Sequence, residues 1–269
     1  MSDLMTYAYA VVPRAEGLRE ATTTLRGVAD APVRLVADAR DDRVMLVVSH
    51  VPAQDFQEGA LKQHLEDLEW LEAVARAHHG VIEALAARTT VLPLRLATVY
   101  LDDNRARDVL EAGRNMFAER LARLAEHVEW GVKIYVEPSA APAAPAAPSA
   151  DLPPGRAYLR DRRQQQSVRD SVYQAAQQAA ERVETAGRKH AAERVRHRVQ
   201  QGALANAAGG GENVVNDAYL VSLTRCEEFL ADVTHAADGL PGVRVEATGP
   251  WAPYSFAMPL SGAAESVPP

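Results

Sequence analysis

Histidine can bind a metal ion and can donate or accept a proton, and this chain of 269 residues holds eight histidines. Two histidines can share a metal ion when they lie one helical turn apart on the same face. His64 and His78 share one predicted helix face, but about 21 Å of helix axis separates them. His78 and its neighbour His79 point in different directions. No metal ligands are therefore predicted, and His78 is expected to be a core or interface histidine satisfied by a hydrogen bond.

Motifs for nucleophilic catalysis or phosphate binding are missing from the sequence. It contains neither a Gly-x-Ser-x-Gly elbow nor a Gly-x-x-x-x-Gly-Lys-Ser/Thr loop. The single cysteine, Cys226, is followed by Glu227 and Glu228, whose charges disfavour a reactive thiolate. One cysteine also excludes an internal disulfide and a thiolate-rich metal site. The sequence therefore predicts a protein that is not an enzyme and holds no cofactor.

The overall charge is acidic, with 36 Asp and Glu against 29 Lys and Arg, a formal net charge of −7. This balance argues against general nucleic-acid binding. The N-terminal residues lack the pattern of an export signal, and no apolar run is long enough to span a membrane. We therefore expect a cytoplasmic protein that contacts neither membrane nor nucleic acid.

Two domains are expected from the length, and the first, residues 1–128, is predicted to be a small mixed sheet with helices. Apolar runs rich in β-branched residues predict its strands, and three- and four-residue periodicity predicts its helices. The predicted strands are 6–12, 33–39, 44–51 and 91–100, and the predicted helices are 55–88 and 105–126. Asp102 supplies N-cap chemistry for the second of these helices.

The second domain, residues 129–257, is predicted to be a modified ferredoxin-like domain, which makes the whole chain α+β. Its predicted strands are 129–136, 214–223 and 243–248, and its predicted helices are 156–200 and 225–237. With a short strand expected between the long helix and the strand at 214–223, the order β, α, short β, β, α, β is that of a split βαβ arrangement. A spacer rich in Pro and Ala, residues 138–154, has prolines at every third position and predicts a polyproline II segment. Residues 258–269 are expected to be a flexible tail.

The long helix at 156–200 is basic, with 11 Lys and Arg against 5 Asp and Glu. Three interpretations are open for it: a solvated face packed lightly on a sheet, a docking surface for an acidic protein, or a nucleic-acid surface. Aromatic residues are concentrated elsewhere, just after the last strand, at Trp251, Tyr254 and Phe256. That segment either packs on its own domain or anchors a partner.

Four blocks of sequence, taken in order, resemble the gas vesicle protein F/L family. They run from about residue 5 to residue 257 and read Leu92-Pro-Leu-Arg95 with Thr98-Val99, Glu129-Trp-Gly-Val-Lys133, Ala218-Tyr-Leu-Val221, and Gly249-Pro-Trp251 with Pro253-Tyr-Ser-Phe-Ala257. The family pattern usually has Phe-Gly after the Pro-Leu-Arg unit, where this chain has Leu96-Ala97. A close backbone approach that needs glycine there is therefore not carried over.

The resemblance implies an accessory protein of gas vesicle assembly, located in the cytoplasm or at the gas vesicle. Its implied partners are the hydrophobic shell protein and other accessory proteins, and some family members are minor vesicle components. A soluble partner with an apolar groove or sheet edge could hold a shell subunit that would otherwise aggregate. The residues expected to make or shape the contact are Arg95, Trp130, Trp251, Tyr254 and Phe256.

The sequence leaves one alternative function and the oligomeric state open. The alternative is a nucleic-acid-binding or small-ligand-binding module that uses the ferredoxin-like domain. A deep pocket with convergent polar groups would support ligand binding or catalysis, whereas a steep salt dependence would support nucleic-acid binding.

Overall fold

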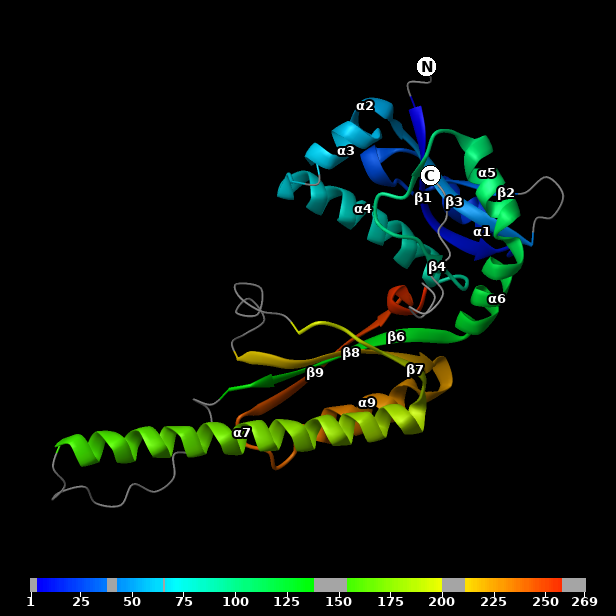
Figure 1. Cartoon of the computed structure of the whole chain (residues 1–269). Helices are drawn as coiled ribbons and strands as arrows, with labels where there is room; N and C mark the ends of the chain where they lie inside the picture. The colour runs from blue at the N-terminus through cyan, green and yellow to red at the C-terminus, as the bar shows by residue number, and fades with distance from the viewer. Residues whose placement is uncertain (1–3, 38–42, 65, 138–153, 200–210, 258–269) are drawn as a thin grey trace. The chain divides into compact units, whose positions relative to one another are not determined.

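The computed structural model describes residues 4–37, 43–64, 66–137, 154–199 and 211–257 (Figure 1). The chain divides into two compact units, a first comprising Met1–Val128 with Trp251–Pro269 and a second comprising Glu129–Pro250. The expected grouping of residues 129–257 differs from this division at its end, because residues 251–257 fall with the first unit. The expected flexible tail and all but the last residue of the expected spacer lie outside the described residues.

The first unit contains one sheet in the order β2-β3-β1-β4, with β5 also paired to β1. Its strands are β1 (Leu4–Pro13), β2 (Arg34–Ala37), β3 (Val44–Pro52), β4 (Leu92–Pro93) and β5 (Val99–Tyr100). Each of these pairings is antiparallel, so the expectation of a mixed sheet is corrected. β3 and β4 run in the same direction, but they lie on opposite sides of β1. No parallel pairing therefore forms between them.

The strand predicted at 91–100 is reduced to the two short strands β4 and β5. Pro93 cannot donate to a ladder, and Ala97 has a left-handed φ of 60°, so the chain turns between them. Between them, Thr98 donates its backbone N–H to the carbonyl of Arg95 at 3.2 Å. The central strand β1 is buried on both faces from Thr6 to Val12, as a nearly continuous apolar run requires.

The helices of the first unit are shorter than the sequence predicted. They are α1 (Leu18–Thr23), α2 (Ala53–Phe56), α3 (Glu58–His64), α4 (Leu68–Ala86), α5 (Asp103–Ala112) and α6 (Arg114–Leu124). The predicted helix 55–88 is interrupted where Asp67 caps α4, accepting from the backbone N–H groups of Glu69 at 3.0 Å and Trp70 at 3.2 Å. The predicted helix 105–126 divides at Gly113, whereas the predicted N-cap at Asp102 is confirmed.

The second unit has the ferredoxin-like strand order. Its elements are β6 (His127–Val136), α7 (Pro154–His190), β7 (Ala191–Arg196), β8 (Glu212–Ser222), α9 (Cys226–Thr234) and β9 (Val243–Trp251). The sheet order is β7-β8-β6-β9, and α7 and α9 lie together along one face of it (Figure 1). The predicted α+β class and ferredoxin-like arrangement are thus confirmed.

The predicted helix 156–200 is wrong at its C-terminal end, because α7 stops at His190 and residues 191–196 form β7. These residues pair antiparallel with β8. The pairing places Arg194 beside the buried Asp217, with Nη2 and Nε of the arginine at 2.6 Å and 3.0 Å from Oδ2 of the carboxylate. This charge-assisted contact and the ladder with β8 favour the strand over the helical propensity of Ala-Ala-Glu-Arg.

Candidate interaction surface

The aromatic segment that begins at Trp251, the last residue of β9, packs on helix α4 of the first unit. Trp251 is 38% exposed, and its ring centroid lies 5.7 Å from that of His79. The hydroxyl of Tyr254 lies 2.9 Å from Nδ1 of the same histidine. On its other side, Nε2 of His79 lies 3.1 Å from a carboxylate oxygen of Glu83. His79 is therefore held from both sides and supports two aromatic rings, and we call residues 251–257 the aromatic strap.

Helix α6 holds the far end of the aromatic strap. Arg123 donates to the carbonyl oxygen of Phe256 at 2.6 Å, and Arg120 donates to that of Ala257 at 3.2 Å. The Phe256 side chain is buried. These contacts fix the strap at both ends, so that Trp251 is presented on an ordered backbone.

A buried polar pair lies in the core of the same unit. The hydroxyl of Tyr7 and Nδ1 of His78 share a hydrogen bond of 3.0 Å, and the backbone N–H of Ala97 donates to the same hydroxyl at 3.0 Å. Burial lowers the pKa of His78 to about 4 and raises that of Tyr7. Both side chains are therefore neutral near pH 7, and the predicted role of His78 as a hydrogen-bonded core histidine is confirmed.

The five residues expected from the sequence are separated by the structure into exposed and buried members. Trp251 and Arg95 are exposed, Tyr254 is half-buried, and Phe256 and Trp130 are buried. Trp130 belongs to the second unit, where a Cβ added at Gly249 would lie 2.9 Å from its Cε3 atom. Phe256 and Trp130 can therefore shape a surface but not touch a partner directly.

Three supports of the aromatic strap, His79, Arg120 and Arg123, were not predicted from the sequence. His79 carried one usable signal, because Glu83 follows it at the i,i+4 spacing of a helix face. The two arginines donate to backbone carbonyls more than 130 positions away. A periodic sequence pattern predicts local contacts and does not predict a contact over such a separation.

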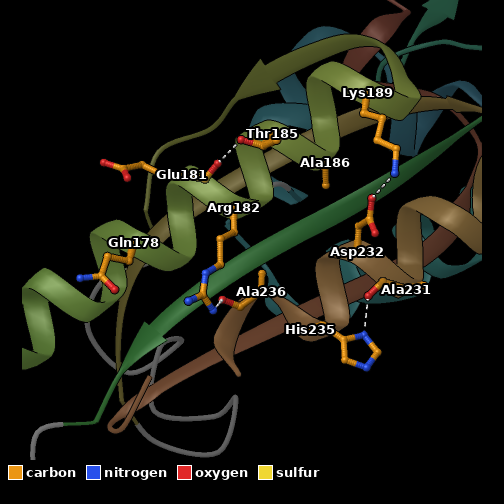
Figure 2. A pocket seen from close by; sticks show the side chains of 10 residues that line it. All are labelled: Gln178, Glu181, Arg182, Thr185, Ala186, Lys189, Ala231, Asp232, His235 and Ala236. Atoms are coloured by element: carbon orange, nitrogen blue, oxygen red, sulfur yellow. Dashed lines mark hydrogen bonds and ion pairs between the residues drawn. The ribbon is translucent and has the colours of Figure 1, made fainter. Parts of the chain in front are cut away.

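A groove of about 570 Å³ lies between α7 and α9 of the second unit (Figure 2). Its polar side chains largely bind groups of their own unit: Nζ of Lys189 lies 3.1 Å from Asp232, and Arg182 donates to the carbonyls of Ala236 and Asp238 at 3.1 Å and 2.9 Å. Hydrogen bonds from His190 and Lys189 lower the pKa of Asp232. These contacts connect α7 with α9 and with the turn that follows α9 in the second unit.

Metal binding finds no support in the described part of the chain. Within it, no three His, Cys, Asp or Glu side chains are arranged to hold a metal ion. Nor does any helix in the described ranges combine the length and apolar character needed to cross a membrane.

The strand orders define a two-unit α+β protein whose second unit is ferredoxin-like. Its fold is similar to the crystal structure of the gas vesicle protein GvpF from Anabaena sp. PCC7120, with a TM-score of 0.61 and 19% identity, covering 95% of this chain and 96% of that one. The crystal structure of GvpF from Microcystis aeruginosa is similar as well, with a TM-score of 0.60 and 17% identity, covering 94% and 99%. At such identities the likeness concerns the fold alone.

The sequence comparisons identify the family. Residues 5–258 match the family described as gas vesicle synthesis protein GvpL/GvpF. The chain is also 43% identical over 262 residues to gas vesicle protein L of Streptomyces sp. (strain CB03234), covering 95% of this chain and 94% of that protein. The chain therefore belongs to the GvpL/GvpF family of gas vesicle proteins, which confirms the predicted resemblance and supports a role connected with gas vesicles.

Proposed function

We propose that this chain assists gas vesicle assembly by binding the hydrophobic shell protein, together with other accessory proteins, and that it catalyses no reaction. Family membership supports the connection with gas vesicles. The observation that carries the proposal is the exposed ring of Trp251, held against His79 on an ordered strap. In this proposal the chain binds the shell protein in the cytoplasm or at the gas vesicle.

The physical argument concerns what a shell subunit needs before it joins the vesicle wall. Its apolar face has no partner while it is free, so it aggregates unless another surface covers that face. An aromatic side chain fixed in place contributes apolar area at a small cost in conformational entropy. Arg95 and Leu96, both exposed on the turn between β4 and β5, provide a second exposed site in the first unit.

The experiment that tests the proposal is co-expression of the shell protein with this chain, measuring the soluble fraction of the shell protein. The wild-type chain is expected to raise that fraction, and Trp251→Ala is expected to remove most of the increase. Met116→Ala is the matched control, because Met116 is an apolar side chain of the first unit with nearly the same exposure, 40% against 38%. A shell protein that aggregates equally with and without the chain would contradict the proposal.

A further inference from the structure

The N-terminal part of α7 extends past the body of its own unit. The helix has 37 residues, about 55 Å of axis, whereas the longest strand of the sheet, β8, has 11 residues and spans about 36 Å. Figure 1 shows α7 continuing past the ends of the strands beside it. Side chains buried against the unit begin at Val172 and recur at helical spacing to His190. We call residues 156–171, none of whose described side chains is buried, the arm.

The arm is basic and carries two exposed apolar side chains. Its five arginines outnumber its two aspartates, which gives a formal charge of +3 and leaves −10 on the rest of the chain. Among its arginines, Arg156, Arg162 and Arg163 make no side-chain ion pair or hydrogen bond in the described structure. Tyr158 and Leu159, at 63% and 55% exposure, lie beside them in the sequence.

The residue types of the arm resemble those found in protein–protein interfaces. Arginine and tyrosine are enriched in the core of protein–protein contacts and among the residues that dominate binding energy. An exposed helix of four turns gains little from its own hydrogen bonds, and most helices in proteins depend on packing for stability. The arm is therefore an unpartnered helix face, and an acidic surface would complement its charge.

An acidic complement with its own exposed apolar residue is present in the first unit of the same chain. At the start of α4, Leu68 is 77% exposed, more than any other large apolar side chain described. Glu66, Asp67, Glu69 and Glu72 surround it in the sequence, and all four are exposed. Of these, Asp67 caps the helix and Glu72 pairs with Arg76, whereas the side chains of Glu66 and Glu69 make no hydrogen bond or ion pair in the described structure.

We propose that the arm of one copy of this chain docks on the start of α4 of a second copy. Arg162 and Arg163 face Glu66 and Glu69 across this contact, and Tyr158 and Leu159 cover Leu68. Two arms cannot pair with each other because their charges repel. A reciprocal exchange, in which each copy supplies one arm and one acidic surface, closes the assembly as a symmetric dimer.

The test is the oligomeric state of the purified full chain, measured by sedimentation velocity over a concentration series at low and high salt. The wild-type chain is expected to dimerise, and the dissociation constant is expected to rise with salt, since exposed charges are screened. The double variant Arg162→Glu with Arg163→Glu should weaken dimerisation about tenfold or more, and Glu66→Arg with Glu69→Arg should do the same. Combining all four substitutions reverses both surfaces and should restore the dimer.

The matched control is Arg19→Glu with Arg88→Glu, which makes the same change in net charge at two exposed arginines outside the arm. It should leave the dimer intact. A chain that stays monomeric at every concentration, a dimer that ignores salt, or a control that weakens dimerisation as much as the arm variant would overturn the proposal. So would failure of the fourfold variant to dimerise. None of these measurements involves the shell protein, so they are independent of the proposed function.

Discussion

Tyr254 and His79 are 175 positions apart in the chain, yet the phenol oxygen lies 2.9 Å from Nδ1 of the imidazole. This hydrogen bond ties the segment after the last strand to helix α4 within the first unit. It also orders the backbone that carries the exposed Trp251. The proposed contact with the shell protein depends on this ordered backbone.

Tyr254→Phe should loosen the aromatic strap. The substitution keeps the ring and removes a half-buried hydrogen bond, so the free energy of unfolding should fall by about 1 kcal/mol. Hydrogen exchange at the backbone amides of residues 251–257 should become faster. Tyr100→Phe is the control, because Tyr100 is half-buried in the same unit and its hydroxyl makes no hydrogen bond in the described structure. Equal exchange in wild type and Tyr254→Phe would mean that the hydrogen bond does not order the strap.

His78 should make the first unit sensitive to mild acid. Burial lowers its pKa to about 4, from an ordinary value of 6.5, so the unfolded chain takes up a proton at a higher pH than the folded chain does. Stability from the neutral imidazole is therefore complete above pH 6.5 and is lost as the pH falls from about 6.5 to about 4. The loss is of the order of 3 kcal/mol.

Chemical denaturation between about pH 7.5 and about pH 4 measures this loss. His78→Gln keeps a polar side chain near Tyr7 but does not titrate, so its stability should depend less steeply on pH than that of the wild type. The other titratable groups are present in both proteins. The difference between the two curves of unfolding free energy against pH therefore gives the contribution of His78. Parallel curves would show that His78 is not the titrating group.

Two glycines within helices should respond to alanine in opposite directions. At Gly80 in α4 an added Cβ meets nothing within 4 Å, so Gly80→Ala should stabilise the protein by about 0.4–1 kcal/mol through helix propensity. At Gly187 in α7 the added Cβ would lie 2.3 Å from Cε1 of Tyr219, and Gly187→Ala should destabilise the protein by about 1–3 kcal/mol. Thermal unfolding of both variants checks the pair. A stabilising Gly187→Ala would refute the close packing of α7 on β8.

Ala97 occupies a left-handed backbone conformation, with a φ of 60°. Since glycine adopts that region without strain, Ala97→Gly should stabilise the protein by roughly 1 kcal/mol despite its larger entropy when unfolded. Ala87→Gly, at a residue with a φ of −66°, provides the contrast and should destabilise. The denaturant midpoints of the two variants measure these changes in stability. A change of the same sign in both variants would contradict the left-handed backbone conformation at Ala97.

The second unit was predictable because its strands and helices have clear periods. The apolar alternation at 131–136, the strand near 214–223 and the helix near 225–237 place the split βαβ order correctly. The sequence predicted a short strand between the long helix and the strand near 214–223 but not its position at β7, because Ala191-Ala-Glu-Arg favours a helix in isolation and forms a strand through its pairing with β8 and the Arg194–Asp217 contact.

The candidate site was only partly predictable. The aromatic segment stood out by composition, and Trp251 proves to be exposed, as a contact residue must be. The contacts that fix the strap were hidden, because His79, Arg120 and Arg123 meet it only through the tertiary fold. Composition identifies large aromatic side chains, whereas their burial depends on packing, which is why Phe256 and Trp130 were expected alongside Trp251.

The most direct test of the central claim is how much shell protein co-purifies with an affinity-tagged copy of this chain. We predict that the wild-type chain and Met116→Ala retain the shell protein to a similar extent, and that Trp251→Ala retains at most about a tenth as much, as expected for the loss of a dominant aromatic contact. A wild-type chain that retains no shell protein, or a Trp251→Ala chain that retains as much as the wild type, would contradict the proposed function.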